Sequence, residues 1–550
     1  MRKKIHSAHP HISPAEQRLI WFSRSLGLAI TLALSLFAAH EMSIELDGIR
    51  YFWLDDDQMI SMRYAYNLSE GHGLVWNPGE PVEGYSNFLW TLLMAAVHLL
   101  PISLAKTALA IKLINLGFAI WVLFLSEKIL RKYQPKSLLA VPALWLSMTL
   151  CGDLLFWSVN GFETTLLTAV FLASIWLFLQ EPVERKTPWL PFFLMSMLPL
   201  IRVDALFPWM GAAIFGLWKS TNRKKASLAI ACSLIPVALH FLWRNHYYGE
   251  WLPNTYFLKV HGNPDLWKTG LLYLFRFAQA YWLAGFLALL AWRHRGSKAL
   301  GPLILAIALA LVFPIIVGKD SFRYARFLAH AIPLLLILAI LGVEFLFEQK
   351  PPLGIALAIG LVLSIWLGPH GARKPAYIVS TQGSPMYGTI LGTAIKRNTD
   401  KDTRIAVLSA GALPYFSLRY GIDLLGKTDP RIAKIQANLD GGAGHNKIKV
   451  ALSLSSKPDL LAAGIAPSRI KSWISLLEEG KAKEITRTQE YAIALVRDES
   501  FQERYVPNPV KLSASIDGKT ALFVHPESKL FLKKTRWIFP QIGPHRRLDR

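Results

Sequence analysis

About eleven apolar segments lie between residues 20 and 367, and they constrain the fold of this chain more than any other feature. A helix needs about 20 mostly apolar residues to cross the hydrocarbon core of a bilayer. The sequence therefore predicts a polytopic α-helical membrane protein. The expected spans are Ile20–His40, Leu104–Leu130, Ser137–Leu155, Phe162–Gln180, Trp189–Ile201, Val203–Trp218, Ala226–Trp243, Gly270–Trp292, Ala299–Val317, Phe327–Phe347 and Pro352–Leu367.

The charge of the chain fits a membrane protein better than a nucleic-acid-binding protein. The formal net charge is +23, although only 18% of the residues are charged and 53% are hydrophobic. Up to about residue 350 the basic residues lie largely in short loops between apolar segments, as the positive-inside rule requires. No nucleic-acid-binding motif is visible. We therefore expect the lipid bilayer, and no nucleic acid, as a partner, with a cytoplasmic N-terminus followed by an uncleaved membrane anchor.

One further apolar run, Phe88–Leu100, has about 13 residues, which is short for a span. If this run does not cross the membrane, the N-terminus and the later basic loops all lie on the cytoplasmic side. If it does cross, every later basic loop moves to the outside. We therefore expect this run to lie at the membrane interface.

The hydropathy falls after Leu367 and stays low to the end of the chain. Residues 404–411, 491–496 and 521–526 are expected strands, and residues 468–480 form an expected amphipathic helix. The sequence predicts a transmembrane domain over residues 1–369 and a soluble α/β domain over residues 370–550. With eleven spans and a cytoplasmic N-terminus, the α/β domain lies outside the cytoplasm.

The first external loop, residues 41–87, contains three consecutive carboxylates, Asp55, Asp56 and Asp57. Adjacent carboxylates repel each other unless a cation or a base-type role uses them. Two interpretations remain open, and both can hold together. Carboxylate oxygens suit a divalent metal, and no His/Cys set has zinc spacing. Alternatively, Asp residues at this position suit the N-cap and the positive end of the following helix.

The predicted topology brings polar residues from separate sequence regions to the same external face. These residues are Glu163, Arg202, Asp204, Arg244, Asn254, Lys259, Lys319, Asp320, Arg323 and Arg326. Arginine and lysine side chains suit a phosphate group, whereas the alternative is anchoring to lipid headgroups. We favour a functional role for Arg323 and Arg326. Lys112 lies deep in a predicted span, where an ionisable group is costly and suggests a role that the sequence does not define.

The run DDDQMISMRYAYNLSEGHGLVWNPGEPVEGYSNFLWTLL (55–93) resembles the first external loop of the type C glycosyltransferases. These are polytopic enzymes that use lipid-phosphate sugars, and the likeness is greatest to the mycobacterial terminal arabinofuranosyltransferase and its bacterial relatives. Further matches follow in the same order along the chain. They are NGFETTL (160–166), the corner at Arg202–Asp204, YYGEWLPNTYFLK (247–259), SFRYARFLAHAIPLL (321–335), GALPYFSLRYGIDLLGKTDPRIA (411–433) and GHNK (444–447).

The resemblance implies roles for individual residues. Asp56 and Asp57 correspond to the base or metal-linked carboxylates of such families, and we favour Asp56 as the base. The expected ligands of the donor phosphate are Arg63, Lys259, Arg323 and Arg326. The expected substrate-binding residues are Glu83, Tyr85, Glu163, Arg202, Asp204, Asn254 and His445. The chain departs from its relatives at Arg202-Val203-Asp204, where they have Arg-Pro-Glu, and at Phe162, where they have Leu.

The implied function is transfer of a sugar, arabinofuranose or another pentose, from a polyprenyl-phosphate donor with inversion at the anomeric carbon. The expected acceptor is a cell-envelope glycan or lipopolysaccharide on the periplasmic face of a bacterial inner membrane. The competing hypothesis is a transporter or flippase of a lipid-linked sugar. Such proteins usually have internal repeats and polar groups near the membrane midplane. No repeat is visible here, and Lys112 is the main feature that favours the transporter.

Overall fold

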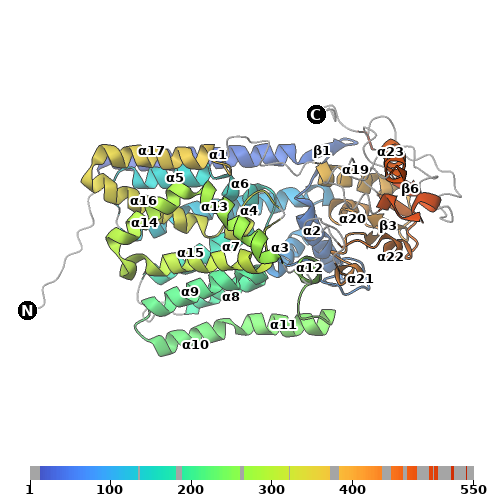
Figure 1. The fold of residues 1–550 in the computed structure, drawn as a ribbon, viewed down its shortest axis with the longest axis horizontal. Coiled ribbons are helices and arrows are strands. Elements are labelled where there is room, and N and C mark those ends of the chain that lie inside the picture. Colours follow the sequence, from blue (N-terminus) through green and yellow to red (C-terminus); the bar gives the residue numbers. More distant parts are fainter. Residues whose placement is uncertain are drawn as a thin grey trace, which may run out of the picture.

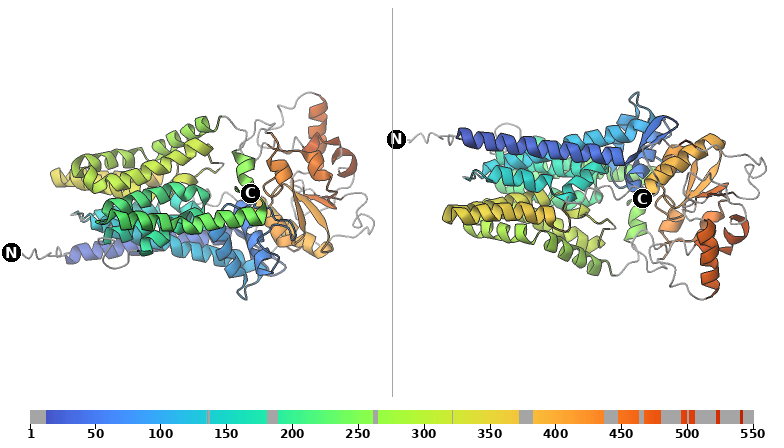
Figure 2. Two further views of the ribbon diagram at one scale, coloured as in Figure 1. Left: turned by 90° about the horizontal axis from the view of Figure 1, so that it is seen from below. Right: turned by 90° about the horizontal axis from the view of Figure 1, so that it is seen from above.

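The computed structural model shows a long helical bundle with a smaller α/β region at one end (Figure 1). The first polar loop lies at the end of the bundle that faces this region, and the N-terminus lies at the opposite end (Figure 2). The loop and the α/β region therefore share one side, as the topology argument predicts. The residues described are 13–133, 135, 137–180, 189–260, 265–320, 322–371, 383–436, 447–462, 467–479, 495–499, 501–505, 522–524 and 540–541.

The described helices make this a multi-pass membrane protein. Five of them are long and apolar enough to cross a membrane, or up to seven if each of two bent helix pairs is one span. The five are α1 (Pro14–Glu41), α4 (Leu104–Lys132), α10 with α11 (Arg223–Ser233, Ile235–Tyr248), α15 (Ser297–Val317) and α16 (Ile332–Gln349). Shorter apolar helices are α3 (Phe88–His98), α5 (Ala140–Thr149), α8 (Trp189–Ile201), α9 (Leu206–Lys219) and α17 (Pro351–Leu367). The count of about eleven spans stays a prediction.

Two segments that were expected to be continuous spans are broken. The segment Ser137–Leu155 divides into α5 and α6 (Gly152–Val159), and α6 bends by 117° into α7 (Thr164–Gln180). Gly152 lies at the break between α5 and α6, where a Cβ would collide with the carbonyl of His370. Hydropathy reports burial in apolar surroundings and not the direction of the helix, so it cannot detect such breaks.

The other broken span is Gly270–Trp292, which divides at Tyr281 into α13 (Leu266–Ala280) and α14 (Trp282–Arg295), bent by 80°. The Tyr281 hydroxyl donates to Asp153 Oδ2 over 2.5 Å and so ties the break to α6. Apolar residues continue through the break, which is why the sequence pattern runs across it.

Helix α3 is too short to cross a bilayer. Its 11 residues rise about 16 Å, roughly half of a hydrocarbon core of about 30 Å. The helix packs against α2 (Asp56–Ser69) and buries Trp90 and Met94. This length and packing agree with the interfacial position that the charge pattern predicts.

The α/β region contains a four-stranded sheet in the order β4-β3-β5-β6. The strands are β3 (Arg404–Val407), β4 (Tyr420–Asp423), β5 (Leu460–Ala462) and β6 (Leu522–Val524). β3 is parallel to β4 and β5, whereas β6 is antiparallel to β5. The helices are α19 (Gly383–Asn398), α20 (Ala412–Ser417), α21 (Pro430–Ala433), α22 (Val450–Leu454) and α23 (Pro467–Glu478).

Most of the predicted elements of this region are confirmed. They include the strands within residues 404–411 and 521–526 and the helix within residues 468–480. The strand predicted at 491–496 falls mostly outside the described residues. Its last two residues, Leu495 and Val496, are helical and pack in the apolar core of the region, so burial and not alternation explains their apolar character.

The α/β region packs directly on the first loop. The loop begins with the hairpin β1 (Ser43–Leu46) and β2 (Ile49–Phe52) and continues into α2. One apolar cluster joins Ile60, Tyr64 and Trp76 of the loop to Ile405 and Leu413 of the α/β region. This packing places the start of α2 against the α/β region.

Candidate active site

An open cavity lies between the helical bundle and the α/β region, and its empty space, with the solvent at its mouth included, is about 1260 Å³. Its wall is formed by the start of α2, by α12 (Asn254–Lys259), by the end of α15 with the loop after it, and by the β4–α21 loop. The charged side chains that line it are Asp57, Glu163, Arg202, Asp204, Lys259, Lys319, Asp320, Arg326 and Lys427. Most of the external polar residues that the topology predicts thus surround one space.

The three consecutive aspartates have three different environments. Asp55 is the N-cap of α2, and its Oδ1 accepts from the backbone N–H of Asp57 over 3.1 Å. Asp56 Oδ1 accepts from the N–H of Ala412, at the start of α20, over 3.0 Å. Asp57 lines the cavity, and its Oδ1 lies 2.5 Å from Lys427 Nζ. The cap interpretation is confirmed for Asp55.

The three aspartates differ in pKa, because burial and neighbouring charges act on each of them differently. Burial, with a further contribution from the charge of Asp57, raises the pKa of Asp55 to about 8. Burial also raises the pKa of Asp56. Burial alone would raise the pKa of Asp57 too, but Lys427, Lys259 and Arg326 hold it below its ordinary value. Asp57 is therefore the aspartate that is ionised at neutral pH and faces the cavity.

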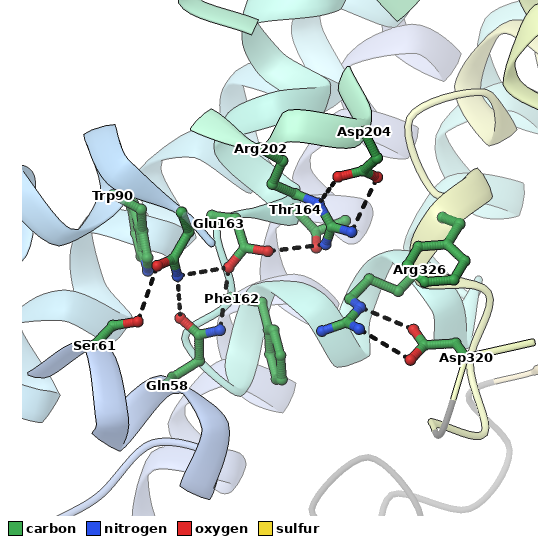
Figure 3. A network of polar contacts seen from close by, with 12 residues as sticks. Gln58, Ser61, Trp90, Phe162, Glu163, Thr164, Arg202, Asp204, Asp320 and Arg326 are labelled. Atoms are coloured by element: carbon green, nitrogen blue, oxygen red, sulfur yellow. Dashed lines mark hydrogen bonds and ion pairs between the residues drawn. The ribbon is translucent and has the colours of Figure 1, made fainter. Parts of the chain in front are cut away.

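Three cations lie around the Asp57 side of the cavity. The described residues provide no hydrogen-bond or ion-pair partner for the ammonium of Lys259, whose pKa is lowered by burial. The guanidinium of Arg326 forms a bidentate ion pair with Asp320, with N–O distances of 2.8 and 2.9 Å (Figure 3). Lys427 is paired with Asp57, and the charge of Asp57 raises its pKa against the effect of burial. Such a cluster suits an anion.

A polar network forms the part of the wall beside the Arg326–Asp320 pair (Figure 3). The guanidinium of Arg202 lies 2.9 Å from Glu163 Oε1 and 2.8 Å from Asp204 Oδ1. The other oxygen of Glu163 accepts from the amides of Gln58 and Asn87, each over 3.1 Å. The network therefore fixes the α6–α7 turn, the start of α2 and the α8–α9 corner relative to one another.

Lys112 and Asn115 of α4 bind backbone carbonyls of the α6–α7 turn. Lys112 Nζ donates to the carbonyl of Val159 over 2.8 Å. The Asn115 amide donates to the carbonyls of residues 157, 158 and 162 over 3.0–3.1 Å. The same turn accepts from the backbone N–H of Asp55 through the carbonyl of Asn160 over 3.2 Å. Lys112 therefore has a partner in the turn that precedes Glu163, which gives this buried lysine a structural contact that the sequence did not reveal.

Arg63 was expected to bind phosphate, but it does not line the cavity. Its buried guanidinium donates to the carbonyls of Trp76 and Arg419, both over 2.6 Å, and to the carbonyl of Pro414. It also donates to Asn77 Oδ1 over 3.1 Å. The guanidinium of Arg63 thus uses its N–H donors to join the first loop to the α/β region.

Three other expected site residues, Glu83, Asn254 and Arg323, do not line the cavity. Glu83 forms a buried ion pair with Arg244, with an N–O distance of 2.7 Å, and Asn254 donates to backbone carbonyls of the β4–α21 loop. Arg323 donates to the carbonyl of Pro369 and does not line the cavity. Tyr85 does line it, and its hydroxyl lies 3.2 Å from that of Tyr248. His445 lies outside the described residues.

The expected divalent metal ion does not fit the residues as they are placed. Within the part of the chain that the structure describes, no three His, Cys, Asp or Glu side chains are grouped closely enough to hold one. Asp56 and Asp57 face different partners, and the ammonium of Lys427 occupies the position beside Asp57.

The sequence reasoning did not single out Lys427, Gln58 or Asn87. Lys427 lies in one of the stretches that match the type C family, GALPYFSLRYGIDLLGKTDPRIA, and this was the available signal. Gln58 and Asn87 also lie in a matching stretch, but they are uncharged and carry no signal of their own.

Comparisons with known proteins agree with this architecture. Residues 374–506 match the family model "Domain of unknown function (DUF8728)". The chain is 24% identical over 359 residues to the terminal beta-(1->2)-arabinofuranosyltransferase of Mycobacterium tuberculosis H37Rv, over 62% of this chain and 50% of the relative. The chain thus spans about half the length of that curated relative.

Two crystal structures of ArnT from Cupriavidus metallidurans, one in the apo state and one bound to undecaprenyl phosphate, also resemble this protein. Each is 12% identical with a TM-score of 0.54, and the match covers 91% of this chain and 97% of ArnT. The resemblance stated from the sequence is confirmed, because the chain is a relative of the mycobacterial arabinofuranosyltransferase and has the fold of ArnT, a type C membrane glycosyltransferase.

Proposed function

We propose that the protein transfers a sugar from a polyprenyl-phosphate donor to a cell-envelope glycan. The observation that carries this proposal is the cavity in which the ionised Asp57 lies beside Lys259 and Arg326 at one end of the helical bundle. The undecaprenyl phosphate bound in one ArnT structure supports a lipid-phosphate donor. The activity named for the mycobacterial relative supports arabinofuranose or another pentose as the sugar.

The charges around the cavity match such a donor. Five cationic and four carboxylate side chains line it, which leaves one positive charge in excess. A polyprenyl-phosphate sugar is a phosphodiester with one negative charge. Lys259 and Lys319 are the cavity lysines whose ammonium groups have no partner among the described residues, but Lys319 is exposed whereas Lys259 is partly buried. Lys259 is therefore our candidate for the first ligand of the donor phosphate.

The proposed reaction is a single displacement. The acceptor hydroxyl oxygen attacks the anomeric carbon while the bond from that carbon to the phosphate oxygen breaks, and the phosphate leaves with the electron pair. Asp57 accepts the hydroxyl proton as general base. Lys259 and Arg326 stabilise the second negative charge that develops on the leaving phosphate. The anomeric configuration is inverted. Asp57, and not Asp56, has this role because Asp56 is bonded to α20.

We place the protein in a bacterial inner membrane, with the cavity and the α/β region on the periplasmic side. The basic loops on the opposite side of the predicted topology support this orientation. The acceptor is then a cell-envelope glycan or lipopolysaccharide, and the α/β region binds or orients it. Residues 1–369 form the membrane domain of this proposal, and residues 370–550 form its soluble domain.

The proposal is tested by transfer of a labelled pentose from its polyprenyl phosphate to isolated envelope glycans and lipopolysaccharide. We expect purified wild-type protein to form a labelled glycan. Lys259→Met should raise the donor KM at least about tenfold, because one charge-assisted contact is lost. Lys268→Met is the matched control, because Lys268 pairs with Asp265 on the exposed surface. Translocation of the lipid by wild-type protein without any transfer would favour the flippase.

A further inference from the structure

The cation that faces Asp57 comes from a loop of the α/β region whose shape is fixed internally. This loop joins β4 to α21 and contains Lys427. Asp423, the last residue of β4, accepts from the N–H groups of Leu425 and Thr428 over 2.9 and 2.8 Å. The loop therefore has a defined conformation before it meets the membrane domain.

The same loop is held from the membrane side. The side-chain amide of Asn254 in α12 donates to the carbonyls of Gly426 and Lys427, both over 2.9 Å. The first loop approaches so closely at Gly84 that a Cβ there would lie 2.7 Å from the Thr428 methyl group and 3.0 Å from the Lys427 carbonyl. The backbone of Lys427 is thus clamped between both parts of the protein, and its ammonium points to the cavity.

We propose that Lys427 is a ligand of the donor phosphate that exchanges partners during the reaction, from Asp57 to the leaving phosphate. This inference rests on the proposed function and deepens it. Lys427 lines the same cavity as Lys259 and Arg326, and its side chain is 13% exposed. An ammonium has three N–H donors, of which Asp57 takes one.

The exchange follows from the charges in the reaction. Asp57 carries one negative charge in the free protein, and its ion pair with Lys427 satisfies both groups. When Asp57 takes the proton of the acceptor hydroxyl, that charge disappears. At the same time the phosphate leaves with the electron pair of the broken bond and gains its second negative charge. Lys427 therefore loses its ion pair with Asp57 and is attracted to the leaving phosphate instead.

One consequence is that the α/β region supplies part of the active site itself. Transfer then requires this region to be docked on α12 and the first loop. Lys434 offers a matched control, because it also belongs to the α/β region and forms an ion pair with Glu250 of the membrane part, yet it does not line the cavity.

The test is binding of undecaprenyl phosphate, the product-like monoester, to the purified full chain. Asp57→Asn should bind it about tenfold more tightly than wild type, because Lys427 is released. Lys427→Met should bind it about tenfold more weakly. The double variant should bind like Lys427→Met, so that the gain from Asp57→Asn disappears. Lys434→Met should bind like wild type.

Two outcomes would overturn the exchange. One is an Asp57→Asn variant that binds no more tightly than wild type, a measurement that needs no substitution of Lys427. The other is a double variant that keeps the gain, because removal of any nearby negative charge would then explain it. Wild-type protein that binds no lipid phosphate at all would instead contradict the proposed donor, so the two failures are distinguishable.

Discussion

Replacing Arg63 by methionine should detach the first loop from the α/β region without touching the cavity. Arg63 is 4% exposed, and three of its four acceptors are backbone carbonyls. Two of these carbonyls, of Pro414 and Arg419, belong to the α/β region. Methionine fills similar space but donates no hydrogen bond, so all three carbonyls lose this donor while they remain buried.

The magnitude follows from these contacts. The carbonyl of Arg419 has no other donor among the described contacts, and leaving it buried without one costs about 1–3 kcal/mol. The carbonyls of Trp76 and Pro414 keep the Asn67 amide and the Leu418 N–H, so each loses one hydrogen bond worth about 1 kcal/mol. The cation–π contact of Arg63 with Trp76, at 4.9 Å to the ring centroid, adds about 1 kcal/mol. We expect a total loss of about 4–6 kcal/mol, which corresponds to a fall in Tm of roughly 10 °C or more for a domain of this size.

Thermal unfolding of the purified protein, together with hydrogen exchange of the β4 and α20 amides, measures this effect. The control is Arg50→Met, which removes a half-exposed arginine of the same loop from its pair with Glu45 and should change Tm little. The reasoning is refuted if Arg63→Met unfolds like wild type but binds polyprenyl phosphate weakly. That result would restore the phosphate-binding role expected from the sequence.

Three further substitutions test the surroundings of the site. The raised pKa of Asp55, about 8, means that the folded protein keeps a proton between about pH 4 and 8 that the unfolded chain releases. The unfolding free energy should therefore fall as pH rises through this window, by up to about 1.4 kcal/mol per pH unit. The fall should be less steep in Asp55→Asn, which keeps the N-cap but has no carboxyl group to titrate. Equal pH slopes of the unfolding free energy for the two proteins, measured by urea unfolding, would contradict this. Gly84→Ala should lower Tm by several degrees and reduce transfer, whereas Gly117→Ala, which has open space around it, should do neither. Arg202→Met should lower the unfolding free energy by about 3–5 kcal/mol, because it leaves the Glu163 carboxylate buried without its ion-pair partner. Adding Glu163→Gln should recover part of this loss. Strictly additive losses of unfolding free energy in the double variant would rule out the pairing.

Local patterns in the sequence predict the membrane location of this chain and the shared face of its polar residues. Long apolar runs and the charges between them depend only on neighbouring residues, so hydropathy and the positive-inside rule detect them. Hydropathy did not reveal either break within a predicted span, because the residues on both sides of Gly152-Asp153 and of Tyr281 are mostly apolar. The strands at residues 404–411 and 521–526 were also predictable, since alternation and turn residues are local signals.

The roles within the site depend on contacts that no local pattern contains. Asp55, Asp56 and Asp57 look equivalent in the sequence, but successive residues at the start of a helix point about 100° apart. Each aspartate therefore meets a different partner. The partner of Asp57 is Lys427, 370 positions away. Arg63 binds mainly backbone carbonyls, which residue type does not encode.

The most direct test of the central claim compares sugar transfer by wild-type protein, Asp57→Asn and Asp56→Asn with one labelled polyprenyl-phosphate pentose and one glycan acceptor. Asp265→Asn, on the exposed surface, is the control. We predict that Asp57→Asn loses transfer by about a thousandfold or more while it still folds, as expected when a general base is removed. Asp56→Asn should retain a measurable rate, because it loses only part of its contact with α20. Full activity in Asp57→Asn, or loss of transfer in Asp56→Asn alone, would contradict the account.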